Sequence, residues 1–324
     1  MQKGNLFIFL QLFVSTLQLS AQSVDSLKNN HNLTINKKAL NFIAMGDWGR
    51  NGEYNQKEVA KEMGIIAKQM GTDFFVITGD NFYPSGVRST QDHRWIDSYE
   101  DIYTAHSLQN DWFVTLGNHD YKGSVQAQID YSKIDRRWNM PARYYSKKFF
   151  LNGDSTKQLL LVFIDTTPLM SEYYESPDHA DVKTQDTATQ RRWLESVLND
   201  PSPYIKWKIV AGHHPLYTGG KRMDGPETKE LHDLLKPIFD KYHVDAYICG
   251  HEHSLQYIKP KGNTHYFISG AGSETTPAVI HPDGGKFAIS ENGFISFTLT
   301  SDTLIAQIIS YQGDMLYKTA IKKD

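Results

Sequence analysis

Short apolar runs recur between positions 41 and 249, and all but one of them end at a glycine. Runs of this length with glycine beside them are typical of strands that are buried on both faces of a sheet. We therefore predict strands at these places. They are residues 41–45, 74–78, 112–116, 159–164, 207–211 and 245–249.

Helical periodicity lies between several of these runs. In the first such stretch, Val59, Met63 and Ile66 fall on one face at a period of 3.6 residues, which predicts an amphipathic helix. Two further stretches show a weaker version of the pattern, and Pro237 would kink the last one. The predicted helices are residues 55–70, 190–198 and 230–242.

The chain changes character toward its C-terminus, where alternating residues and tight turns predict a meander of strands. These strands are residues 293–300, 304–310 and 315–320. Strand–helix alternation followed by an antiparallel run favours an α/β sandwich with its helices outside. We find no internal repeat and no second core, so residues 38–324 are predicted to form one domain.

The N-terminus has the features of a secretory signal. Lys3 precedes a mostly apolar stretch, residues 6–19, that is short and polar for a membrane span. Small residues at 20–22 would suit a signal peptidase. We predict a signal peptide at 1–22, a polar linker at 23–37, and export to a periplasm or to the medium. An N-terminal anchor or a helix of the fold is the alternative.

The composition of the chain bears on which ligands the protein could bind. A formal charge of −3 leaves no electrostatic footprint for nucleic acid or an anionic membrane. Thirteen histidines and a single cysteine favour imidazole and carboxylate metal sites over structural zinc. Cys249 lies in an apolar run and is predicted to be a buried, inert thiol.

Residues with ligand chemistry follow five of the predicted strands. Ligands bind at the carboxyl ends of strands in open α/β sheets, so these side chains are expected to meet at one edge. Each one alone could serve a turn or the core. Together, carboxylate, amide, phenol and imidazole groups favour Fe, Mn or Zn, and seven donors suit two ions that share a bridging carboxylate. The candidates are Asp47, Asp80, Tyr83, Asn118, His213, His251 and His253.

Five motifs carry a family resemblance. They are Gly46-Asp47-Trp48-Gly49, Gly79-Asp80-Asn81-Phe82-Tyr83, Gly117-Asn118-His119-Asp120, Val210-Ala211-Gly212-His213 and Gly250-His251-Glu252-His253. This set resembles the ligand motifs of the purple acid phosphatases, within the calcineurin-like metallophosphoesterases. Many members of the wider superfamily have a histidine in the first motif, where this chain has Trp48-Gly49. Instead it has Tyr83, as in purple acid phosphatases, where a tyrosinate binds ferric iron. Residues 124–138 and 245–257 resemble the mammalian-type tartrate-resistant acid phosphatase.

The resemblance implies a four-layer αββα sandwich of mixed sheets with helices on both outer faces. It also implies an exported acid phosphatase that hydrolyses phosphate monoesters with a metal-bound hydroxide. The implied Fe(III) ligands are Asp47, Asp80, Tyr83 and His253. The implied ligands of a divalent Fe, Zn or Mn are Asp80, Asn118, His213 and His251.

Two further residues are candidates for catalysis. His119 follows the ligand Asn118, so we predict that it orients the phosphoryl group or protonates the leaving oxygen. Asp120 either holds the His119 ring in one tautomer or caps a turn. His214 is expected to line the pocket at most.

Two departures from the resembled family are visible. The mammalian relatives have a disulfide that joins the segment after the Asp165 strand to the segment downstream of the His213 loop, and this chain has no cysteine in either place. Those relatives also carry a loop that represses activity until it is cut. Residues 172–189 occupy its place with a different sequence, are polar and acidic, and are predicted to form an exposed loop.

The expected substrates are small phosphate esters or phosphoproteins. We expect a monomer that binds no nucleic acid and keeps no membrane anchor after signal cleavage. A phosphodiesterase or nucleotidase of the same fold is the nearest alternative, because the same metal site serves those reactions. A non-catalytic binding protein with a relic metal site is a second alternative, against which the intact ligand set argues.

Overall fold

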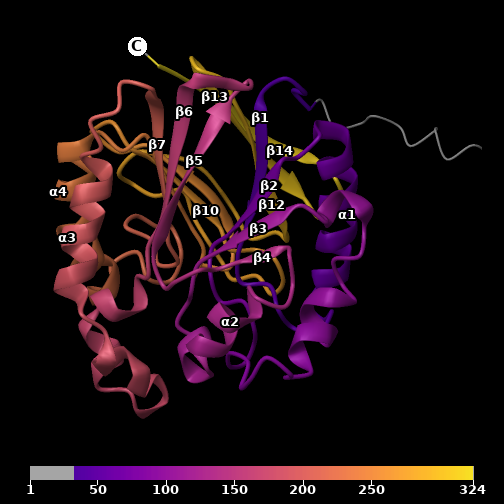
Figure 1. The fold of residues 1–324 in the computed structure, drawn as a ribbon, viewed down its shortest axis with the longest axis vertical. Helices are drawn as coiled ribbons and strands as arrows, with labels where there is room; N and C mark the ends of the chain where they lie inside the picture. The colour runs from indigo at the N-terminus through magenta and orange to yellow at the C-terminus, as the bar shows by residue number, and fades with distance from the viewer. Residues whose placement is uncertain (1–32, 324) are drawn as a thin grey trace, which may run out of the picture. The chain divides into compact units, whose positions relative to one another are not determined.

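The computed structural model describes residues 33–323, so the predicted signal peptide at 1–22 and most of the linker lie outside the described part. Within residues 33–323, two seven-stranded sheets pack face to face. Figure 1 shows α1 (Gln56–Met70) on one side of the sheets and α3 (Thr187–Leu198) and α4 (Pro226–Tyr242) on the other. The predicted αββα sandwich is confirmed.

The first sheet has the strand order β14-β13-β12-β1-β2-β3-β4. Strands β1 to β4 run parallel, and β1 pairs antiparallel with β12, where the predicted C-terminal meander begins. The bounds are β1 (Leu40–Met45), β2 (Phe74–Ile77), β3 (Asp111–Val114), β4 (Trp138–Asn139), β12 (Gly293–Leu299), β13 (Thr303–Ser310) and β14 (Met315–Lys322).

The second sheet has the order β11-β9-β10-β8-β7-β6-β5. Strands β6, β7, β8 and β10 run parallel, and the remaining pairings are antiparallel. The bounds are β5 (Tyr145–Leu151), β6 (Asp154–Phe163), β7 (Ile205–Ala211), β8 (Ala246–Cys249), β9 (Leu255–Ile258), β10 (His265–Ser269) and β11 (Gly285–Ile289). Both sheets therefore contain a block of parallel strands, whose carboxyl ends carry the predicted motifs.

Alternation along β1 shows how the layers are built. Phe42 faces the second sheet, and its ring stacks on Phe297 of β12 in the same sheet. Phe297 packs edge-on against Phe267 of β10 in the second sheet, with 5.2 Å between the ring centroids. The intervening residues Ile43 and Met45 belong to the cluster that includes the apolar face of α1. Because successive side chains point to opposite faces, a strand that is apolar throughout contributes side chains to both hydrophobic clusters.

The three predicted helices are present, with earlier starts for the last two. Helix α4 begins at Pro226, where a proline is tolerated because the first-turn amide needs no partner, and continues through Pro237. A further short helix, α2 (Val125–Tyr131), was not predicted, and the Ser124 hydroxyl caps it by accepting from the Ala127 amide at 3.2 Å. None of the helices in residues 33–323 is long and apolar enough to cross a membrane.

Residues 172–189 are mostly exposed, as predicted, but the segment is not an irregular loop. The segment folds into 3₁₀ helices at Ser171–Tyr174 and Pro177–Thr184, followed by the first turn of α3. Tyr173, His179 and Val182 are buried, because they pack inward while the acidic side chains between them stay outside. Their spacing matches neither a helix nor a strand, so no periodic pattern revealed them.

The structure also describes the single cysteine and the last residues of the predicted linker. Cys249 is buried on β8, and burial raises the pKa of its thiol well above the usual range, as expected for an inert cysteine. The last residues of the predicted linker belong to the domain, because the Thr34 amide donates to Gln307 Oε1 at 2.6 Å. Packed structure thus begins a few residues before Lys38.

Candidate metal centre

Glycines place the ligand residues at the strand ends. A Cβ on Gly117, which follows β3, would lie 2.2 Å from Asp80 Oδ1. A Cβ on Gly250, which follows β8, would lie 2.3 Å from Asp47 Oδ2. Any side chain at either position would displace a carboxylate from the site. The glycines in these motifs therefore make room for the ligands of neighbouring strands.

Three of the predicted ligands have a left-handed backbone conformation. Asp47, Asp80 and His251 have φ values of 59°, 48° and 68°. Such a conformation costs a non-glycine residue roughly 1–3 kcal/mol and persists only where surrounding contacts hold it. Here the His251 amide donates to Asp47 Oδ2 at 2.9 Å, so one ligand fixes the backbone of another. Strain of this kind is concentrated at functional sites.

The first group of donors surrounds the Tyr83 hydroxyl. Its oxygen lies 3.0 Å from Asp47 Oδ1, 2.9 Å from Asp80 Oδ2 and 3.1 Å from His253 Nε2. These are the four side chains predicted to hold the ferric ion. Two carboxylates, a phenol and an imidazole within hydrogen-bond distance form a donor set suited to a hard cation.

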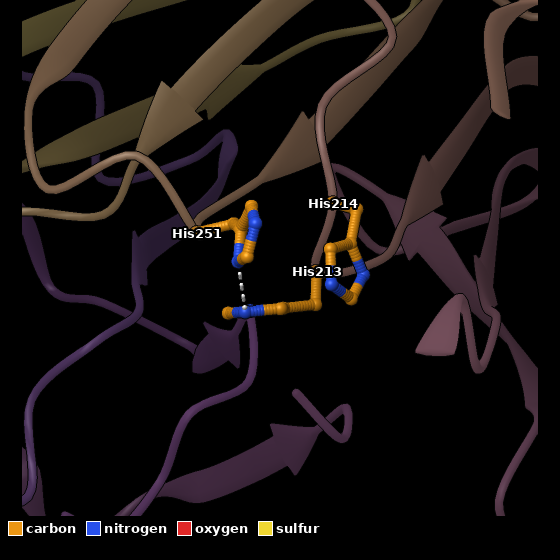
Figure 2. Close-up of side chains that lie close together, drawn as sticks. All are labelled: His213, His214 and His251. Atoms are coloured by element: carbon orange, nitrogen blue, oxygen red, sulfur yellow. Dashed lines mark hydrogen bonds between the residues drawn. The ribbon is translucent and has the colours of Figure 1, made fainter. Parts of the chain in front are cut away.

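The second group of donors lies on the other side of Asp80. His213 Nε2 lies 3.1 Å from His251 Nδ1 and 3.5 Å from Asp80 Oδ1, and Figure 2 shows the two histidines meeting. The Thr78 carbonyl accepts a hydrogen bond from His213 Nδ1 at 2.7 Å. The Nε2 lone pair of the ring is therefore the one that could bind a metal ion. Buried Asn118 Oδ1 has no hydrogen-bond partner among the described residues. Asn118 lines one small cavity with Asp80, His251 and His253, so all seven predicted ligands lie at one site.

Electrostatics show that the cluster attracts positive charge. Burial opposes charge on both His213 and Asp80, but their mutual attraction prevails. It raises the pKa of His213 to about 9 and holds the pKa of Asp80 far below its usual range. Burial, with Asp47 and Asp80, raises the pKa of the Tyr83 phenol. A phenolate there therefore needs the charge of a bound cation. The donor set and the unpartnered Asn118 oxygen fit such cations.

His119 lies beside the donors. Its amide donates to Asp80 Oδ1 at 2.8 Å, and its ring Nδ1 lies 2.7 Å from the Pro84 carbonyl oxygen. The carbonyl can only accept, so Nδ1 carries a proton and Nε2 faces the site, 4.0 Å from Asp80 Oδ2. Burial lowers the pKa of this imidazole, and the Asp80 charge partly opposes that effect. The ring is held where a leaving group could receive its proton.

The suggestion that Asp120 holds the His119 ring is not supported. Its carboxylate instead accepts from the amides of Gly117 and Asn81 and from Gln128 Nε2, at 2.8–3.1 Å. The ring of His119 points the other way, toward Pro84. Burial and the charge on Asp80 raise the pKa of Asp120 to about 7. The alternative reading is correct: Asp120 ties together the loops after β2 and β3.

His214 lies beside His213 and His251, and both of its ring nitrogens have hydrogen-bond partners. Its ring nitrogens lie 2.8 Å from Thr166 Oγ1 and 2.9 Å from the Tyr173 hydroxyl. Thr166 Oγ1 already accepts from the amides of His213 and His214, so it donates to Nδ1. Nε2 then donates to Tyr173. With both nitrogens engaged, the ring packs 4.2 Å from His251 (Figure 2). Sequence reasoning missed Thr166 and Tyr173.

A small cavity of about 90 Å³ opens onto the donors. Its volume corresponds to roughly three waters, enough for a phosphoryl-sized group. Sequence reasoning missed Lys221, Arg222 and Thr276, which lie in segments without a recognisable motif. The lining residues are Asp80, Asn118, His119, Lys221, Arg222, His251, His253 and Thr276.

Comparison of sequences relates the chain to known hydrolases. Residues 40–255 match the model of the calcineurin-like phosphoesterase family. Purple acid phosphatase 17 of Arabidopsis thaliana is 36% identical over 300 residues, covering 88% of this chain and 85% of the relative. Human tartrate-resistant acid phosphatase type 5 is 34% identical over 311 residues, covering 88% and 91%.

Solved structures show the same fold. GAP50, described as the anchor in the inner membrane complex of Plasmodium, superposes with a TM-score of 0.77 at 25% identity, covering 88% of this chain and 89% of that one. Purple acid phosphatase PPD1 from yellow lupin gives a TM-score of 0.64 at 15% identity, covering 88% and 54%. At that identity the second likeness concerns the fold alone.

Proposed function

We propose, from the premise that the chain belongs to the calcineurin-like phosphoesterases and within them to the purple acid phosphatases, that it is an exported phosphomonoesterase with an Fe(III)–M(II) centre. As a member of this family the chain is a hydrolase of the acid phosphatase type. The paired centre, the ferric ion, the divalent Fe, Zn or Mn, and export are the parts of the proposal that go further.

The observation that carries the proposal is the position of Asp80 between two groups of donors. Its Oδ2 atom lies with Tyr83, and its Oδ1 atom lies 3.5 Å from His213 Nε2. A carboxylate that offers one oxygen to each of two groups is suited to bridge two cations. The phenol on one side and the amide of Asn118 on the other make the two positions chemically different, as a trivalent–divalent pair requires.

A bound pair of ions supplies charge neutralisation for the phosphoryl group and a hydroxide at acidic pH. The side chains of this chain do the rest. His119 keeps a proton on Nδ1 through Pro84, so in its protonated form the Nε2 proton is available to the leaving oxygen. Asp120 holds the loops that carry Asp80 and Asn118, which keeps His119 within reach of the reacting group.

The test is purification of the mature protein with iron available, followed by metal analysis, a visible spectrum and assays on esters. We expect about two metal ions per chain, a visible charge-transfer band, and faster turnover of nitrophenyl phosphate than of its bis-ester. Preference for the bis-ester would establish the phosphodiesterase alternative. No turnover of either ester by metal-loaded protein would establish a non-catalytic role, which the likeness to the GAP50 anchor makes worth testing.

Export and partners are part of the proposal. We propose that residues 1–22 are removed and that the mature protein is a monomer acting on small phosphate esters or phosphoproteins in a periplasm or the medium. The N-terminal sequence of protein recovered outside the cytoplasm tests this directly. A mature protein that still begins at Met1 would contradict cleavage, and one retained with membranes would contradict the absence of an anchor.

A further inference from the structure

Two side chains with fixed positive charge line the cavity beside the metal centre. Lys221 and Arg222 follow a pair of glycines in the loop after His213 and face a cavity shared with Asn118 and His119. Neither belongs to the donor groups. The seven donors and His119 account for a scissile phosphoryl group, so these two cations call for another explanation.

Arg222 is held in place by a buried carboxylate. Glu252, which stands between the ligands His251 and His253 and has no exposed surface, accepts from the Arg222 amide at 3.1 Å. The guanidinium lies 3.6 Å from the same oxygen. A Cβ on Gly220 would lie 2.2 Å from Glu252 Oε2, so the loop can approach only because that residue is glycine. The loop that carries two ligands thus also positions a guanidinium.

Lys221 has a charge that no acid neutralises at close range. Among residues 33–323, no carboxylate lies within ion-pair distance of its ammonium group, and the side chain is exposed at the cavity. Arg222 forms ion pairs with Glu227 at 3.5 Å and with Glu252 at 3.6 Å, which hold its guanidinium at the cavity beside the unpaired Lys221. The outer side of the cavity therefore has positive charge available for an anionic ligand.

The size of the cavity indicates which part of a substrate meets these cations. A volume of about 90 Å³ holds a phosphoryl group but not its leaving group, which must extend outward along the lining. Guanidinium and ammonium groups are the usual protein partners of phosphate. We propose that Lys221 and Arg222 form a second anion subsite, which binds a second phosphate group carried on the leaving side of a bisphosphorylated substrate.

This inference rests on the proposed function and specifies its substrate class. In the reaction, a water oxygen bonds to the scissile phosphorus and the bond to the leaving oxygen breaks. The leaving oxygen keeps the electron pair and takes up a proton. The second phosphate stays on the leaving group, where Lys221 and Arg222 hold it. It can be joined through an anhydride, as in pyrophosphate, or through a carbon skeleton, as in a sugar bisphosphate.

Kinetics of matched variants test the subsite. Lys221→Gln is expected to lower kcat/KM roughly tenfold for a bisphosphorylated substrate and less than about twofold for nitrophenyl phosphate. Arg222→Lys, which keeps a charge beside Glu252, should show the same selectivity with a smaller loss. Lys229→Gln on exposed α4 is the control and should change neither. Pyrophosphate and fructose 1,6-bisphosphate serve as separate substrates, and the larger loss identifies the source of the second phosphate.

Binding provides a readout independent of turnover. Calorimetry of metal-loaded protein should show methylenediphosphonate binding roughly tenfold more tightly than methylphosphonate, and Lys221→Gln should remove that difference. Equal losses on both classes of substrate would mean that the cations hold the scissile group, and no loss would mean that they bind no substrate; either result overturns the subsite. A wild-type protein without phosphatase activity would overturn the proposed function instead, and the two phosphonates would still test the subsite.

Discussion

At the scale of single residues, Tyr83 distinguishes this site most clearly from a site for divalent ions only. A buried phenol flanked by Asp47 and Asp80 resists ionisation, since burial and both carboxylates raise its pKa. Only a strongly charged cation would make the phenolate the stable form. The chain therefore places a poor ligand for divalent ions where a trivalent ion would make it a good one.

Tyr83→Phe tests this directly. Removal of the hydroxyl takes away the oxygen that lies about 3 Å from three other donors, so the visible charge-transfer band should disappear from metal-loaded protein. Absorbance spectra with metal analysis are the measurement. Tyr103→Phe, a buried tyrosine of the α1 core, is the control and should leave the band unchanged. A band that survives in Tyr83→Phe would remove this residue from the ligand set.

The His119→Ala variant tests the proposal that His119 donates a proton to the leaving group and does not bind metal. Loss of a positioned general acid usually lowers turnover by roughly 10²–10⁴-fold, and we expect a drop in that range for a simple alkyl phosphate. Metal content should stay unchanged, because no predicted ligand depends on the ring. A leaving group of low pKa, which needs no proton, should be less affected than a simple alkyl phosphate. Loss of metal in this variant would show that the histidine was misassigned.

At the scale of elements, a buried network connects the loops around the site. The Tyr121 hydroxyl, just after β3, donates to Asp165 at the end of β6, and Arg143 donates to the same hydroxyl at 2.8 Å. Arg143 also pairs with Asp181 of the 3₁₀ segment Pro177–Thr184. One chain of polar contacts thus joins both sheets to the 3₁₀ segment Pro177–Thr184.

Asp165 gives this network a pH dependence. Burial raises its pKa from 3.8 to about 7, although Tyr121 and Arg143 oppose the shift. The folded state therefore holds the proton more tightly than the unfolded state. This contribution to stability is complete below pH 3.8 and is lost as the pH rises toward 7, amounting to roughly 4 kcal/mol at most.

Asp165→Asn should abolish that loss, since the amide cannot ionise and its oxygen can still accept from Tyr121. The midpoint of thermal unfolding of the variant should rise relative to wild type between pH 4 and pH 7. Asp154→Asn at the exposed start of β6 should show no such trend. Parallel midpoint curves for wild type and Asp165→Asn would contradict the assignment.

Some strands of this fold were predictable from the sequence and others were not. The strands that carry ligands were predictable because both faces are buried, so their residues are apolar throughout, and glycine must follow them. Edge strands such as β5 and β11 were not, because their exposed faces carry lysines that hide the alternation. The site residues were predictable as a set, but the partner of each side chain was not. His119 and Asp120 are neighbours in the sequence, yet His119 contacts Pro84 while Asp120 accepts from Gly117.

At the scale of the whole molecule, the metal centre lies where the two sheets meet and its donors come from both. Asp47, Asp80 and Asn118 follow strands of the first sheet, and His213 and His251 follow strands of the second. A cation shared between them is therefore a cross-link between layers. In residues 33–323 no disulfide is available for this purpose, because the only cysteine is Cys249.

Removal of metal should therefore destabilise the entire domain. A ligand present at 100 times its dissociation constant stabilises the folded state by about 2.7 kcal/mol per site. At roughly 2–4 °C per kcal/mol for a domain near this size, the unfolding midpoint should fall by several degrees on chelation and recover with iron plus a divalent ion. His213→Ala should blunt the response. An unchanged midpoint after verified metal loss would mean that the apolar layers alone hold the two sheets together, and that the strained Asp47, Asp80 and His251 backbones do not depend on a cation.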